Sequence, residues 1–291
     1  MLGTLFAIIA PVFVTAGIGY VWARQERPFH AETITSLVTT IGTPCLVFST
    51  LTGLELNPGL VFEIALAAVL AMAVFITIGT VVLRLTGQNL PSFLPSLMFS
   101  NCGNVGLPLC LFAFGEEGLA LAIGYFATSA ILQFTVGIGL ASGSMSPRQI
   151  LKTPMIYAVL LGAAAMYFRI DVPQWLQNCV ALLGQLTIPL MLMALGVSLA
   201  KLRLNSLRAT FLLSCLRLVM GFLVGWGISA LFGLEGAARG VVIVQSSMPV
   251  AVFNYLFALR YGRQHEAVAS LVLMSTAISF ATLPLLLLFV L

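Results

Sequence analysis

The sequence has very few charged residues. Only 8% of its 291 residues are charged, while 60% are hydrophobic. A typical soluble domain carries about 25% charged residues, so this chain has too little polar surface to be one. Its apolar runs reach roughly 20 residues, which suits membrane-spanning helices better than the short alternating strands of an outer-membrane barrel. We therefore expect an all-α integral membrane protein that crosses the bilayer several times.

Residues and motifs for catalysis are also scarce. The two histidines, His30 and His265, fall in predicted loops, and the five cysteines form no CxxC pair. A histidine-based triad or zinc site within the membrane is therefore excluded. The sequence contains no P-loop, Rossmann glycine motif, HExxH or pair of acids within one span. We expect no enzyme activity, no cofactor and no nucleic-acid partner, and a self-contained ATP-driven pump is excluded.

Ten apolar runs can be separated by polar, proline or glycine interruptions. They cover residues 3–23, 33–52, 60–83, 93–114, 118–141, 150–168, 174–199, 207–232, 238–259 and 266–290. The loops after the odd-numbered runs hold ten basic residues, namely Arg24, Arg27, Arg84, Arg148, Lys152, Lys201, Arg203, Arg208, Arg260 and Arg263. The other loops hold two, Arg169 and Arg239. By the positive-inside rule, the odd loops are cytoplasmic and both termini lie outside, in a bacterial-type inner (plasma) membrane.

The two halves of the chain repeat at a fixed offset of 145 residues. Pro28 then pairs with Pro173 and Pro44 with Pro189, and Leu-Phe-Ala at 111–113 recurs at 256–258. The predicted units are residues 1–146 and 147–291, each with five helices. Because five is odd, the second unit enters the membrane from the opposite side. The pattern therefore predicts two inverted five-helix repeats, an architecture common among secondary transporters.

Two of the predicted helices, the fourth and the ninth, are interrupted by polar and helix-weakening residues. The fourth contains Asn101-Cys102-Gly103-Asn104, and the offset places this segment opposite Ser246-Ser247-Met248-Pro249 in the ninth. Glycine and proline weaken helices, and freed peptide groups within a bilayer need partners from protein, water or ligand. Paired broken helices are therefore the best sequence pointer to a transporter's binding site. Pro44 and Pro189 predict a second pair of kinks, in helices 2 and 7.

At these residues the sequence resembles the auxin efflux carrier family, with the bile-acid/sodium symporter fold as a more distant relative. The similarity rests on the segment from Asn101 to Leu109 and on Met248-Pro249-Val250-Ala251-Val252-Phe253-Asn254-Tyr255. It implies a scaffold domain and a transport domain, with helices 4 and 9 crossing beside an anionic, carboxylate-bearing substrate. Plant members carry a proline at the helix 9 crossing, where this chain has Asn254. Their long cytoplasmic loop is absent, because residues 142–149 form only a short link.

The candidate substrate-binding residues lie at the two breaks. They are Asn101, Gly103, Asn104, Gly106, Pro108, Ser246, Ser247, Pro249 and Asn254. Side-chain amides can bind a carboxylate, and so can the half-helix N-termini, which are expected beyond Gly106 and Pro249, although the amides could equally cap the broken backbone. The two glycines are expected to permit close backbone crossing rather than to contact substrate.

Three further residues are candidates for substrate binding or ion coupling: Arg217, Glu63 and Gln245. Arg217 is the one basic residue well inside a predicted span, and such a residue is a functional candidate by default. It could attract an anion, or it could bond a neighbouring backbone carbonyl. Glu63 could carry a proton, or it could be an interfacial carboxylate. A coupling Na⁺ near Asn104 and Ser247 is a further candidate, since broken helices offer oxygen ligands.

The leading hypothesis is a secondary carrier of a small organic anion, such as a dicarboxylate or an auxin-like acid, working by an elevator-like alternating access. The alternatives are a sodium-coupled symporter of the bile-acid type and a channel or receptor that uses the same site. Coupling to H⁺ or Na⁺ and assembly as a homodimer stay open at this point.

Overall fold

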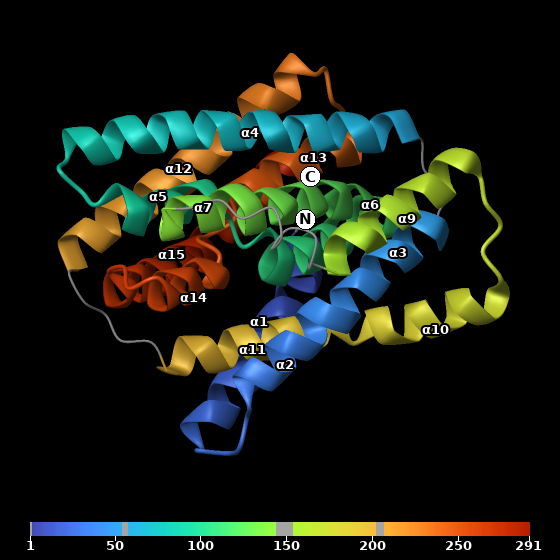
Figure 1. The fold of residues 1–291 in the computed structure, drawn as a ribbon, viewed down its shortest axis with the longest axis horizontal. Coiled ribbons are helices and arrows are strands. Elements are labelled where there is room, and N and C mark those ends of the chain that lie inside the picture. The colour runs from blue at the N-terminus through green and yellow to red at the C-terminus, as the bar shows by residue number, and fades with distance from the viewer. Residues whose placement is uncertain (1, 54–57, 144–153, 202–206) are drawn as a thin grey trace.

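A computed structural model describes residues 2–53, 58–143, 154–201 and 207–291 (Figure 1). Within these ranges the chain is helical, as expected from its composition. The α-helices are α1 (Leu2–Arg24), α2 (Ala31–Leu37), α3 (Thr43–Gly53), α4 (Pro58–Leu85), α5 (Leu90–Met98), α6 (Leu107–Leu132), α7 (Ile138–Ser142), α9 (Pro154–Phe168), α10 (Gln174–Gln185), α11 (Thr187–Lys201), α12 (Leu207–Leu231), α13 (Gly236–Ser247), α14 (Val252–Arg260) and α15 (His265–Val290). Three π-helical turns join neighbouring helices at Val38–Gly42, Cys102–Gly106 and Gln133–Gly137.

Six helical stretches in the described ranges are long and apolar enough to cross a membrane. One of them, Cys102–Ser142, has 41 residues, about twice the length that a bilayer requires. Gly115 divides it, because its backbone angles of φ 67° and ψ −158° are not helical. Glycine adopts a positive φ without the steric cost that a side chain would add. The kink falls just after residue 114, where the sequence predicts the end of the fourth span. The full count of ten spans stays a prediction.

The helices pack as two groups. One group contains α1, α2, α3, α9, α10 and α11, in which α1 packs against α11 and α3 against α9 and α10. The other contains α4, α5, α6, α12, α13, α14 and α15, in which α12 packs against α13 and α15 and α6 against α4 and α13. In Figure 1, α4 lies across the top of the view, while α2 and α11 lie toward the bottom. The breaks lie in the second group, next to the first.

The prolines of the second predicted pair follow irregular turns. Pro44 comes directly after the π-helical turn Val38–Gly42, and Pro189 comes just after the junction between α10 and α11. A proline removes one helix hydrogen bond and its ring crowds the preceding turn, so the helix deforms on the N-terminal side. Each proline therefore lies within a few residues of an irregular turn, while a kink at either position stays a prediction.

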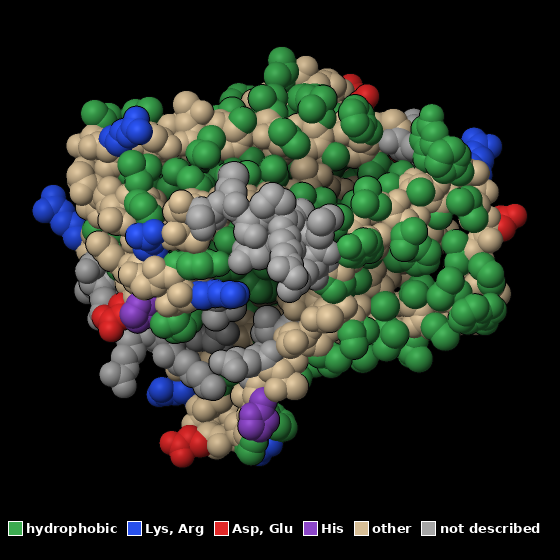
Figure 2. All heavy atoms as spheres, viewed as in Figure 1, with side chains coloured by type: hydrophobic (Ala, Val, Ile, Leu, Met, Phe, Trp, Pro, Cys, Tyr) green, Lys and Arg blue, Asp and Glu red, His purple; other side chains and the backbone are tan. Residues whose placement is uncertain are grey.

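Hydrophobic side chains cover much of the outer surface (Figure 2). Large exposed examples include Phe6, Phe62, Leu85 and Trp175. In a membrane protein such residues face lipid tails, which need no polar cover. On the face shown, Lys and Arg side chains gather mainly toward the left and lower edges. Arg148, Lys152 and Arg203, together with the predicted boundary at 146 and 147, lie outside the described residues.

Candidate functional site

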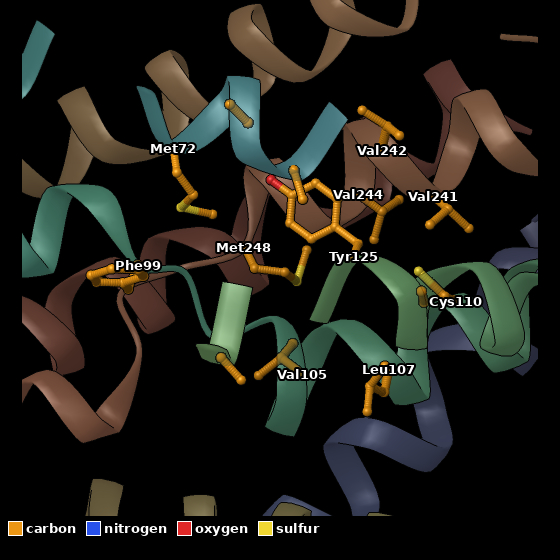
Figure 3. Packing of buried hydrophobic residues seen from close by; sticks show 14 of the residues in the cluster. Met72, Phe99, Val105, Leu107, Cys110, Tyr125, Val241, Val242, Val244 and Met248 are labelled. Atoms are coloured by element: carbon orange, nitrogen blue, oxygen red, sulfur yellow. The ribbon is translucent and has the colours of Figure 1, made fainter. Parts of the chain in front are cut away.

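The two breaks cross each other and share backbone hydrogen bonds. The Asn101 amide N–H donates to the Pro249 carbonyl at 2.7 Å, and the Ala251 N–H donates to the Phe99 carbonyl at 3.1 Å. Ser100 and Val250 thus form an antiparallel bridge. Each broken helix satisfies the peptide groups that the other leaves open, as burial in a membrane requires. Figure 3 shows buried side chains gathered around this crossing, including Phe99 and Met248 from the two breaks.

Local sequence explains where the first broken helix begins and ends. α5 starts at Leu90 because the Asn89 side chain accepts hydrogen bonds from the Ser92 N–H at 3.0 Å and the Ser92 hydroxyl at 2.7 Å. After α5 ends, the chain is extended at Phe99, with ψ 115°. It then resumes as a π-helical turn at Cys102, capped by the Asn101 carbonyl, which accepts from two N–H groups at 3.2 Å each. The second half-helix therefore begins at Cys102, so the expectation that its N-terminus lies beyond Gly106 is wrong.

A cavity of about 260 Å³ lies between the crossing and the other group of helices. The crossing contributes Asn101, Gly103, Asn104, Val252 and Phe253 to its wall. The facing group contributes threonines and apolar residues, among them Thr39, Thr40, Thr43, Leu190, Met191 and Leu195. α6 and the following π-helical turn add Phe126, Gln133 and Phe134. No acidic, basic or histidine side chain lines this cavity within the described parts of the chain.

Two half-helix N-termini form part of the cavity wall. One begins at Cys102, after Asn101, and the other is α14, which begins at Val252, after Ala251. The first N–H groups of a helix have no partner within that helix, and its N-terminus carries a partial positive charge. The Asn101 side chain adds a buried amide Nδ2 without a hydrogen-bond acceptor among the described residues. The cavity therefore offers N–H donors and dipoles that suit an anion.

The glycines of the first break lie against side chains of neighbouring segments, and the close backbone crossing expected of them stays a prediction. A Cβ atom at Gly103 would lie 2.9 Å from the Phe126 ring and 3.1 Å from the Met191 side chain, and one at Gly106 would overlap the Gln245 amide group. Of these two, only Gly103 borders the cavity. Pro108 is buried near the start of α6, directly after the π-helical turn Cys102–Gly106 and Leu107.

The polar candidates of the second break form the hydrogen-bond network of the crossing. The Asn254 amide Nδ2 donates to the Phe99 carbonyl at 3.1 Å, and its Oδ1 accepts from Gln133 Nε2 at 3.2 Å. Ser246 Oγ lies 2.9 Å from the Tyr125 hydroxyl, and Ser247 Oγ donates to the carbonyl of Ile243 in its own helix at 2.6 Å. Pro249 contributes its carbonyl to the bridge. Their direct contact with substrate stays a prediction.

The three further candidates lie in different surroundings. Arg217 is fully buried and donates to the Ser246 carbonyl at 2.9 Å, away from the cavity wall. Gln245 is also fully buried, with Nε2 donating to the Ala122 carbonyl at 3.4 Å. Glu63 is exposed near the start of α4.

Sequence reasoning missed most of the wall that faces the crossing. Thr39, Thr40 and Thr43 cluster within one turn or so of Pro44, and such a run of hydroxyls beside a predicted kink could have identified them. Met191 and Phe126 carry no signal of this kind, because apolar residues are common throughout the chain.

Comparison with known proteins identifies the family. The sequence profile of the family described as "Membrane transport protein" matches residues 4–145 and 138–287. An uncharacterized transporter of Methanocaldococcus jannaschii is 26% identical over 275 residues, covering 88% of each chain. One of Methanothermobacter thermautotrophicus is 28% identical over 271 residues, covering 88% of this chain and 87% of the other. A protein of Rhizobium meliloti named "Putative malonate transporter" is 25% identical over 198 residues, or 63% of this chain and 62% of its own. The chain therefore belongs to the auxin efflux carrier-like family of membrane transport proteins.

Proposed function

We propose that this protein is a secondary carrier of a small organic anion, and that the cavity beside the crossing is its substrate site. The observation that carries the proposal is the convergence of two half-helix N-termini with Asn101 and Asn104 on one cavity, whose described wall holds no acidic residue. A helix N-terminus stabilises an anion by up to about 2 kcal/mol in a partly buried setting. A carboxylate is the common organic group that fits such donors.

The size and lining of the cavity favour a short dicarboxylate. Its volume of about 260 Å³ lies just below the range of roughly 300–1,000 Å³ that drug-sized ligands occupy. Threonines face the amides from the other wall, so polar groups are available for both ends of a short molecule. Malonate is the first substrate to test, since the Rhizobium relative carries that name.

The two groups of helices suggest how the site changes sides. We propose that the ten spans form two inverted five-helix repeats, with both termini outside. The group that contains the crossing then moves as a transport domain against the group that contains α1, α3 and α11. Because the cavity lies between the groups, such a movement exposes it to each side in turn.

Uptake by the purified protein in liposomes tests the proposal. We expect saturable uptake of labelled malonate and exchange with unlabelled malonate across the membrane, which a channel would not give. Asn101→Ala and Asn104→Ala should each raise the KM at least about tenfold, while the protein stays folded. Asn178→Ala is the matched control, because Asn178 is an exposed amide of α10 that bonds only Gln174, at 2.9 Å, among the described residues.

Two outcomes contradict the proposal. If no mono- or dicarboxylate is taken up by folded wild-type protein, the substrate class is wrong. If uptake occurs but both cavity variants keep the wild-type KM, the site lies elsewhere.

A further inference from the structure

The C-terminal ends of the two broken helices also meet at the crossing. α5 ends at Met98 and α13 ends at Ser247. Carbonyl groups at a helix C-terminus lack partners within the helix and carry a partial negative charge. In secondary transporters, half-helix C-terminal ends of this kind coordinate a coupling Na⁺ or proton. The occupants of these two ends therefore bear on how transport is coupled.

Protein donors reach carbonyl groups at both ends. At α5, the Phe99 carbonyl accepts from the Ala251 N–H and from the Asn254 side chain, each at 3.1 Å. At α13, the Gln245 carbonyl accepts from the Ser100 hydroxyl at 3.0 Å, and the Ser246 carbonyl accepts from Arg217 Nη2 at 2.9 Å. Three of these donors are neutral, and Arg217 alone brings a full positive charge.

Arg217 is a buried cation for which the described residues offer no carboxylate partner. Its side chain is 0% exposed, and its guanidinium carbon lies 4.5 Å from the centre of the Phe75 ring. Nε and Nη1 find no hydrogen-bond acceptor in the described part of the chain. A buried charge costs several kcal/mol unless it is paired, and among the described residues the Ser246 carbonyl and the Phe75 ring are the groups that contact the guanidinium. The guanidinium is linked to the cavity wall by neighbouring contacts, because Ser246 follows Gln245 and the Gln245 carbonyl accepts from Ser100, which lines the cavity.

Two glycines of α12 allow this helix to pack closely against α13 next to Arg217. Gly221 and Gly225 follow Arg217 at intervals of four residues, so all three lie on one face. A Cβ atom at Gly221 would overlap the Ser246 carbonyl, and one at Gly225 would lie 2.8 Å from the Ser246 side chain. The close approach of the two helices fixes the guanidinium at the carbonyl end of α13.

We propose that Arg217 is a built-in cation that takes the place of a coupling Na⁺ at the end of α13. This inference rests on the proposed carrier function. It adds which group compensates the negative charge of the helix end and of the substrate. The guanidinium neutralises the negative helix end and supplies a fixed positive charge near a substrate site that has none in its own described wall. Arg217 is thus a positioning residue, and anion transport proceeds without sodium.

The first test compares cations on the wild-type protein. Malonate uptake is measured with equal Na⁺, K⁺ or choline on both sides of the liposome, and thermal unfolding is measured in the corresponding chloride salts. We expect uptake rates that agree within about twofold and no stabilisation specific to Na⁺. Uptake that requires Na⁺, or a clear Na⁺-specific rise in Tm, overturns the inference and leaves the carrier function intact. Absence of uptake with every cation instead contradicts the carrier function, and the unfolding measurement still tests the cation site.

The second test separates charge from hydrogen bonding at Arg217. Arg217→Lys keeps the charge, whereas Arg217→Gln keeps a donor for the Ser246 carbonyl and removes the charge. We expect Arg217→Lys to retain malonate uptake in sodium-free buffer and Arg217→Gln to raise the KM at least about tenfold, with both variants folded. Equal KM values for wild type and Arg217→Gln overturn the inference. If Arg217→Gln does not fold, the cation comparison on the wild type decides.

Discussion

Replacing Asn254 with alanine tests whether the hydrogen-bond network of the crossing holds the site together. Asn254 is 2% exposed and joins three segments, because it donates to the Phe99 carbonyl and accepts from Gln133. Alanine removes both bonds. The Phe99 carbonyl keeps the bond from the Ala251 N–H, so the substitution leaves Gln133 as the one group without its partner.

The expected cost follows from these contacts. A side-chain hydrogen bond within a membrane protein contributes about 0.6 kcal/mol on average, and an unsatisfied buried polar group adds roughly 1–3 kcal/mol. Gln133 borders the cavity and can turn its amide toward it, which limits the cost of leaving that amide unsatisfied. We therefore expect a loss of about 1–3 kcal/mol, or roughly 2–10 °C in Tm for a chain of this size. The freed amide also changes the cavity wall, so the KM for malonate should change as well.

Thermal unfolding of the purified protein and malonate uptake in liposomes provide the measurements. Ser229→Ala is the matched control, because Ser229 is equally buried but donates to the Trp226 carbonyl of its own helix at 2.8 Å. Such local bonds contribute little, so the control should lose less than about 0.5 kcal/mol. If the Asn254 variant matches the control in Tm and keeps the wild-type KM, the network does not hold the site.

Two further predictions concern close helix contacts. Gly196→Ala should abolish stable folded protein, because a Cβ atom there would overlap the Ala16 carbonyl of α1, whereas Gly17→Ala has open space and should change Tm by no more than about 2 °C. Detergent-solubilised yield and size-exclusion profiles compare the two. Gly106→Ala should lower both Tm and uptake, since the new methyl group displaces the buried Gln245 amide; a variant with wild-type uptake would contradict the packing described for that residue.

Composition and glycine or proline placement predicted the features that depend on local chemistry. The helical class and the break after residue 100 both follow from residues within a few positions of the feature. The sequence predicted that Gly103 and Gly106 permit a close backbone crossing, whereas the groups nearest to a Cβ atom at either position are side chains. Local reasoning was sufficient for the helical class and the break, because the residues responsible adjoin these features in the sequence.

The roles of the polar residues were less predictable, because their partners are distant in sequence. Asn254 bonds to Phe99, 155 residues away, and Arg217 bonds to Ser246 in the following helix. The offset of 145 residues aligned Ser100 with Gln245, which are in fact hydrogen-bonded. It could not show that the second half-helix begins at Cys102, or that threonines before Pro44 face it across the cavity.

The shared bonds of the crossing also constrain how the chain is made. Ser100 and Phe99 find their partners at Gln245, Ala251 and Asn254, about 150 residues later in the sequence. A ribosome that adds about 5–20 residues per second needs several seconds or more to produce that segment. During this interval the open peptide groups of the first break have no partner from the second half. They must remain hydrated or in contact with the insertion machinery, so membrane integration of the first half is completed only when the second half arrives.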